Sequence, residues 1–272
     1  MFKVAHYNPN DDQKWLITRF ETFRFDESTF ILDKFIPRPL ISLIFHFDER
    51  PLIIENNPIV LEPFFVAPVI PKAIFLKFHG NMDVFIVACN PTVFSRIFNI
   101  DLSPVTKRSI NLPADIFYPL WEEIRQIKYD EDRIVHFNNF ITSRCRSENY
   151  QPDVIDILYQ KIIEKSIKTP LHIIMEECGV SCRTLQRKFI KRTGVTPKVL
   201  MRIVRLNYLW TKINNHYAVN YQDLVFEGNF FDQAHFINDF KSIVGETPNH
   251  FFNRNLNIVE LFSGKDDNNT GA

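Results

Sequence analysis

The sequence predicts an α+β protein: a mostly β N-terminal domain with two packed helices, then an all-α domain built from two helix-turn-helix units. Three observations predict this fold class. Residues 1–100 contain short segments rich in β-branched and aromatic residues, interrupted by Pro, Asn or Gly. From Pro113 onward the apolar residues recur at helical spacing. The C-terminal half repeats itself, and Ser181 of the first copy corresponds to Asp232 of the second, 51 positions later.

The N-terminal strands are predicted at four segments, which are LISLIFHF, PIVLEPFFVAPVI, AIFLKFHG and MDVFIVAC. Prolines at positions 37, 39, 51, 58, 63, 68 and 71 suit strand edges and turns and not helix interiors. We therefore expect a compact, mostly antiparallel β domain.

Two amphipathic helices are predicted after this domain. The apolar stripe of the first comprises Ile116, Phe117, Leu120, Trp121, Ile124 and Ile127, and that of the second comprises Ile134, Phe137 and Ile141. Packing of both helices on the β domain is the simpler interpretation, and a dimer interface is the alternative. The polar segment SRCRSENYQPD at 143–153 lacks periodicity. It predicts a boundary between a sensing or dimerisation domain at 1–147 and a helical domain at 152–262.

Net charge, cysteine content and apolar runs indicate where the protein is expected to be located but do not identify a binding partner. The formal net charge is zero, so any attraction to nucleic acid has to come from a local charge pattern. Four scattered cysteines without a CxxC pair favour free thiols in a reducing compartment. The first residues do not resemble a secretory signal, and no apolar run reaches membrane-spanning length. We expect a cytoplasmic protein that does not associate with membranes.

The two copies of the repeat are SCRTLQRKFIKRTGVTP and DQAHFINDFKSIVGETP. Each begins with a good N-cap, Ser181 or Asp232, and ends its helix at a glycine, Gly194 or Gly245. A short helix precedes each copy: LHIIMEEC ends at Gly179, and YQDLVFEG follows Asn220. The units span about 170–194 and 220–245, and a helix over 197–213 joins them. Each second helix is therefore available to enter a major groove.

The outward positions of these second helices carry side chains suited to DNA bases. With Leu185 and Phe189 facing inward, the outward residues of the first unit are Cys182, Arg183, Gln186 and Arg187. The equivalent residues of the second unit are Gln233, Ala234, Ile237 and Asn238. Arg forms paired hydrogen bonds with guanine, Gln or Asn with adenine, and small apolar groups contact the thymine methyl.

A basic stretch overlaps the first unit. Nine basic residues and no acidic residue occur between Arg183 and Lys212. The predicted phosphate contacts are Lys188, Lys191, Arg192, Lys198 and Arg202, with Lys241 in the second unit. A solvated basic face is the alternative. The second unit contains more acidic residues, so we expect the first unit to dominate affinity.

These residues resemble a known family. The segment from Pro170 to Phe252, above all FFDQAHFINDFKSIVGETP, resembles the DNA-binding domain of the AraC/XylS transcription regulators. The resemblance covers about a third of the chain. It implies two recognition helices in successive major grooves, with base contacts from Arg183, Gln186, Arg187, Gln233, Ala234 and Asn238. Three positions depart from the family pattern, namely Met175, Val225 and Asn229.

The resemblance implies a transcription regulator, expected to be an activator, with double-stranded DNA and RNA polymerase as partners. The N-terminal domain would bind a small-molecule effector or form a homodimer. We predict no catalytic residue, metal or cofactor. A metal site is not expected because His46, His79, Cys178 and Cys182 lack the clustering that such a site needs. The alternative is a cupin-like or DNA-modifying enzyme with a helix-turn-helix tail.

Overall fold

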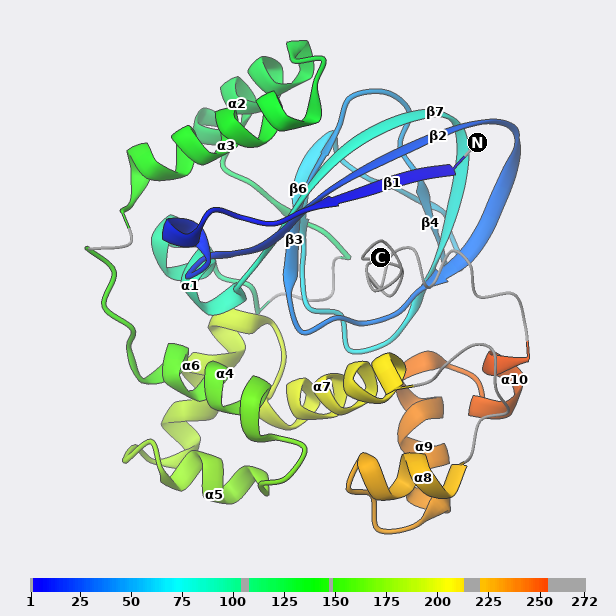
Figure 1. Ribbon diagram of the computed structural model, residues 1–272, viewed down its shortest axis with the longest axis vertical. Coiled ribbons are helices and arrows are strands. Elements are labelled where there is room, and N and C mark those ends of the chain that lie inside the picture. The colour runs from blue at the N-terminus through cyan, green and yellow to red at the C-terminus, as the bar shows by residue number, and fades with distance from the viewer. Residues whose placement is uncertain (1, 104–107, 147–148, 213–220, 254–272) are drawn as a thin grey trace, which may run out of the picture.

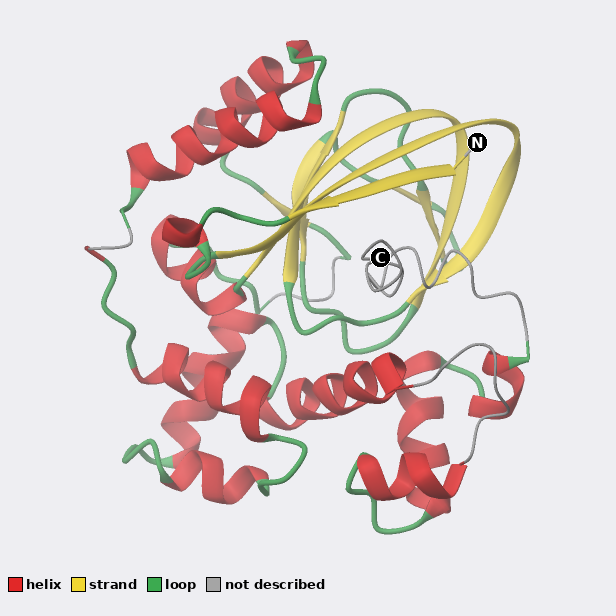
Figure 2. Cartoon of the chain, viewed as in Figure 1, coloured by secondary structure: helices red, strands yellow, loops and turns green. Residues whose placement is uncertain are grey.

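A curled β-sheet and a group of helices lie side by side in the computed structural model of the chain (Figure 1). The structure describes residues 2–103, 108–146, 149–212 and 221–253. Every strand pairing in these ranges is antiparallel, and the strands precede nearly all of the helices in the sequence (Figure 2). The predicted α+β class is confirmed. No helix within the described ranges is long and apolar enough to cross a membrane.

The sheet consists of β1 (Phe2–Tyr7), β2 (Ile17–Phe35), β3 (Ile41–His46), β4 (Leu52–Ile54), β5 (Ile59–Val60), β6 (Phe64–Ala67), β7 (Ile74–Cys89) and β8 (Ile110–Asn111). Its main order is β1-β2-β7-β3-β6-β8. One edge of β7 pairs with β2 along nearly its whole length, and the other edge pairs with β4 near its start and β3 near its end. Register shifts in β2 at 17–19 and 27–31 bend the long ribbon, as bulges do.

The helices α1 (Pro91–Phe98), α2 (Ala114–Gln126) and α3 (Asp130–Arg144) cover one side of the sheet (Figure 1). Phe117 and Phe137 are fully buried in the same core as Phe20 and Phe85 of the sheet. The ring centroids of Phe20 and Phe137 are 6.0 Å apart, in an edge-on arrangement that aromatic pairs favour. The two predicted helices therefore pack on the β domain, as the simpler interpretation held. Ile127 lies just beyond the end of α2 and not within it.

The C-terminal helices are α4 (Val154–Lys165), α5 (Leu171–Glu176), α6 (Cys182–Thr193), α7 (Pro197–Lys212), α8 (Tyr221–Glu227), α9 (Gln233–Val244) and α10 (Pro248–Phe252). In Figure 1, α7 runs from the group α4–α6 to the group α8–α10. The helix-turn-helix order predicted from the repeat is thus present twice. Ile213, Asn220 and residues 254–262, which the prediction included, lie outside the described residues.

The hydrophobic core does not stop at the predicted boundary between 147 and 152. The largest cluster of buried residues joins the β domain, α2 and α3 to the first helix-turn-helix unit, including Leu185 and Phe189 of α6. A second cluster fills the other unit and includes Ile36 from the β domain. Both helix-turn-helix units are therefore packed against the N-terminal half of the chain.

Candidate DNA interface

The two second helices, α6 and α9, begin and end in the same way. The side chain of Ser181 accepts a hydrogen bond from the Thr184 amide at 3.4 Å, and that of Asp232 accepts one from the His235 amide at 2.7 Å. At the other end, Gly194 and Gly245 have φ angles of 82° and 86°. Only glycine adopts this left-handed conformation without a steric cost, so both helices stop where the repeat predicts.

The turns between the paired helices tolerate the departures from the family pattern. Asn229 has a φ angle of 53°, the left-handed conformation that asparagine accepts more readily than most residues. Met175 is buried in the main core, and Val225 packs half-buried against the second cluster. The larger side chains are therefore accommodated by local packing.

The outer face of α6 presents the predicted recognition residues to solvent. Leu185 and Phe189 are completely buried, while Arg183, Gln186 and Arg187 are exposed on the opposite side. Neither Arg183 nor Arg187 forms an ion pair with a described residue, so both guanidinium groups are available to contact DNA. The structure therefore brings the three predicted base-contacting residues of the first unit together on one face.

The corresponding face of α9 is less polar and less basic. Gln233, Ala234 and Asn238 are exposed, as predicted from the repeat. Ile237, which we expected to face outward, is instead half-buried against the second core cluster. Ile237 therefore contributes to packing and does not belong with the exposed residues of α9.

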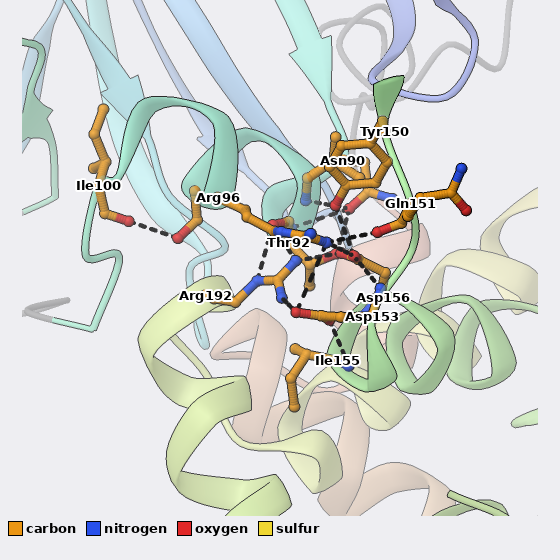
Figure 3. Close-up of polar contacts among 12 residues, drawn as sticks. Asn90, Thr92, Arg96, Ile100, Tyr150, Gln151, Asp153, Ile155, Asp156 and Arg192 are labelled. Carbon is orange, nitrogen blue, oxygen red and sulfur yellow. Dashed lines mark hydrogen bonds and ion pairs between the residues drawn. The ribbon is translucent and has the colours of Figure 1, made fainter. Parts of the chain in front are cut away.

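Arg192 is not available for the phosphate contact that the basic stretch suggests. Its side chain is only 11% exposed and lies between α1 and α4 (Figure 3). It donates hydrogen bonds to the Thr92 carbonyl at 2.6 and 2.9 Å and to Asp153 at 2.6 Å, and it pairs with Asp156. Burial opposes ionisation of Asp153, but the hydrogen bond and charge of Arg192, together with hydrogen bonds from the Asp156 and Ile155 amides, hold the Asp153 pKa below its usual value.

Arg202 is also engaged within the protein. Its Nε donates to Asp239 of α9 at 2.5 Å, and its guanidinium contacts Ser242. This contact joins α7 to α9, so the partly exposed Arg202 is less available for the predicted phosphate contact, which stays a prediction. Of the predicted phosphate-binding residues, Lys188, Lys191, Lys198 and Lys241 remain exposed.

The second unit is also held by a residue that sequence patterns did not single out. Lys34 of β2 donates to the Val244 carbonyl at the end of α9, at 3.0 Å, and pairs with Glu246 at 2.5 Å. Beside it, the Ala73 amide donates to the Ile243 carbonyl at 2.7 Å. No local pattern connects residue 34 with residue 246, so only the folded chain shows this contact.

Comparison with known proteins agrees with this geometry. Residues 174–254 match a family described as a helix-turn-helix domain, and residues 5–111 match a domain of unknown function (DUF6597). No curated protein has a significantly similar sequence.

Solved structures with a similar chain include ToxT from Vibrio cholerae, with 13% identity over 92% of this chain and 97% of that chain and a TM-score of 0.45. A fatty-acid-bound ToxT structure has 14% identity over 86% and 94% of the chains and a TM-score of 0.45. The AraC-like transcriptional activator CuxR has 12% identity over 76% and 86%, with a TM-score of 0.24. These TM-scores are below 0.5, so the assignment depends on the family match and on the two capped units. Residues 174–254 therefore form a helix-turn-helix domain of the AraC type, and its two capped units are those of a DNA-binding regulator.

Proposed function

We propose that the chain recognises an asymmetric duplex site, with α6 and α9 in successive major grooves and α6 supplying most of the affinity. The observation that carries this proposal is the exposed set Arg183, Gln186 and Arg187 on a helix whose opposite face is completely buried. Arginine and glutamine at such positions form paired hydrogen bonds with guanine and adenine. The α9 face offers no exposed arginine, so it adds specificity with less charge.

Salt dependence tests the phosphate contacts of this interface. A duplex selected from a random library by the purified protein is titrated at several salt concentrations. Because each phosphate contact releases counterions, the slope of log K against log salt changes by about 0.9 per contact. Lys188→Ala with Lys191→Ala should therefore make the slope shallower by roughly 2. The exposed pair Lys3→Ala with Lys128→Ala, on β1 and just after α2, is the control, and an equal change in both double variants would contradict the assignment.

We further propose that the β domain binds a small, mostly apolar effector in the hollow of the sheet. A cavity of about 70 Å³ lies there, lined by Phe23, Phe35, Arg38, Ser42, Ile44, His46, Pro51, Leu61, Ala67, Leu76, Phe78, Met82, Val84 and Ile86. His46 is 4% exposed, and neither of its ring nitrogens has a hydrogen-bond partner among the described residues. A ligand with an apolar body and one hydrogen-bonding group would satisfy both features.

The chain connects this cavity directly to the DNA-binding units. In the segment 34–38, Phe35 and Arg38 line the cavity. In the same segment, Lys34 and Ile36 contact the second unit, and the Pro37 carbonyl accepts a hydrogen bond from Asn207 of α7 at 2.8 Å. A ligand that displaces Phe35 or Arg38 would therefore move the residues that hold α7 and α9. Activation through RNA polymerase and homodimer formation stay predictions from the sequence.

The stability of the protein should fall in mild acid because of His46. Burial, with a smaller contribution from the charge of Arg50, lowers the pKa of His46 to about 3. The unfolded chain takes up this proton near pH 6.5, so its protonation favours unfolding as pH falls from about 6.5 towards 3. We expect His46 to remove about 2 kcal/mol of stability between pH 7 and pH 5.

Urea unfolding of wild type and His46→Leu at both pH values measures this contribution. Between pH 7 and pH 5, His46→Leu should lose about 2 kcal/mol less stability than wild type. His172→Leu, at an exposed position, serves as the control. Equal pH dependence in wild type and His46→Leu would show that His46 is not a buried neutral group of the cavity wall, and the proposed polar anchor for the effector would be wrong.

A further inference from the structure

Two phenylalanines beside the second recognition helix are unusually exposed. Phe231 is 92% exposed and Phe226 is 86% exposed, and they are the most exposed large hydrophobic side chains among the described residues. A single exposed hydrophobic residue is common on protein surfaces, so the position of each phenylalanine relative to α9 decides whether it can bind a partner. The two residues flank the turn between α8 and α9.

Phe231 lies at the end of α9 that leads into the groove. It directly precedes the N-cap Asp232, and its amide donates to the ring of His235 at 3.4 Å. Its neighbour Phe230 packs inward, with ring centroids 5.3 Å from both His235 and Phe236. The N-terminal residues of a recognition helix are those that approach base edges. Phe231 is therefore continuous with the exposed face formed by Gln233 and Ala234.

The N-terminal end of α9 carries no basic residue beside Phe231 that could pair with phosphate as Arg or Lys would. No exposed arginine occurs on the described part of α9, and its single lysine, Lys241, is in the last turn. The C5-methyl of thymine is the apolar group that the major groove displays, and phenylalanine and alanine are side chains that contact it. The N-cap Asp232 is acidic, so its negative charge disfavours a close approach of this end of α9 to a phosphate group.

We propose that Phe231 packs on the C5-methyl group of a thymine and makes the second unit selective for an A·T pair at that position. The proposal depends on the proposed function, because it requires α9 to enter a major groove. Phe226 occupies the last turn of α8, the helix that crosses the DNA backbone in such units, so it is outside the groove and provides a matched control.

The test replaces single thymines of a selected duplex with deoxyuridine, which removes only the C5-methyl group. Wild type should bind one such duplex about fourfold more weakly, which is the value expected for losing contact with one methyl-sized group. Phe231→Ser should weaken binding to the thymine duplex by a similar factor or more. It should then show no further loss on the deoxyuridine duplex, because the contact is already absent. Phe226→Ser should keep the thymine preference of wild type.

The outcomes distinguish failure of the methyl contact from failure of the proposed function. If the wild-type protein selects no duplex at all, the proposed function fails and this inference fails with it. If the duplex is bound but Phe231→Ser retains the wild-type thymine preference at every position, only the methyl contact is overturned. If Phe231→Ser binds DNA like wild type and loses only transcriptional output, a protein partner occupies this surface and the proposal is wrong. The melting temperature of Phe231→Ser should match wild type, because the replaced side chain is almost fully exposed.

Discussion

Replacing Arg183, Gln186 and Arg187 together with alanine should abolish sequence-specific DNA binding while the protein stays folded. All three side chains are exposed on α6, so their loss removes no core contact. A well-formed paired hydrogen bond to a base contributes about 1–3 kcal/mol of discrimination. Allowing for non-additivity, the combined loss should reach roughly a thousandfold in affinity for the selected duplex. Binding to random-sequence duplex should fall much less, because the exposed lysines are kept.

Gel-shift titration of the selected and random duplexes measures both effects. The matched control is Arg125→Ala with Gln126→Ala, which removes the same residue types from the exposed end of α2. That control should bind both duplexes as wild type does. If the triple variant kept the wild-type ratio of specific to random binding, α6 would not be the recognition helix of this protein.

The parts of this interface that sequence predicted are those set by local chemistry. Ser181 and Gly194 are caps because of interactions within a few residues, and the repeat places Asp232 and Gly245 in the same roles. The alternation of buried Leu185 with exposed Gln186 follows from helical spacing alone. Such features need no knowledge of the rest of the fold.

The partners of individual charged residues depend on long-range packing and were not predictable. Arg192 is one of nine similar basic residues in its stretch, but its partners are Thr92, 100 positions earlier, and Asp153, 39 positions earlier. A local count of charge cannot distinguish it from the exposed Lys191. The curl of the sheet is another example, because β7 pairs with segments as distant as β2 and β4. Sequence therefore predicted which side chains of α6 are buried or exposed by helical spacing better than it predicted which basic side chains have partners inside the protein.

The contact between Lys34 and the second unit offers a direct test of how the halves of the chain are coupled. The Lys34 side chain is 9% exposed and its partner Glu246 is 13% exposed, so the pair is largely removed from water. The Lys34 ammonium also lies on the Val244 carbonyl at the C-terminal end of α9, where a positive charge is favourable. This one side chain thus contacts both the end of α9 and the Glu246 carboxylate, which His250 also contacts.

Lys34→Met should lower the free energy of unfolding by about 2–3 kcal/mol, somewhat less than the cost of breaking a fully buried pair. Because the contact fixes the end of α9, amide exchange should accelerate in α9 and α10 and stay unchanged in α6. Urea unfolding and hydrogen exchange measure these effects, and Lys72→Met, at an exposed position, is the control. Glu246→Met combined with Lys34→Met should recover part of the loss, since two apolar groups leave no charge unpaired.

The double variant decides what the contact contributes. If the effects of Lys34→Met and Glu246→Met simply add, the pair has no energetic coupling, and other contacts, such as those of Ile36 and the Ala73 hydrogen bond, hold the second unit. A coupling of about 1–2 kcal/mol would instead show that a single charged contact holds the second unit against the β domain. Because Lys34 is next to Phe35 in the cavity wall, that coupling would also give an effector in the cavity a short route to the second recognition helix.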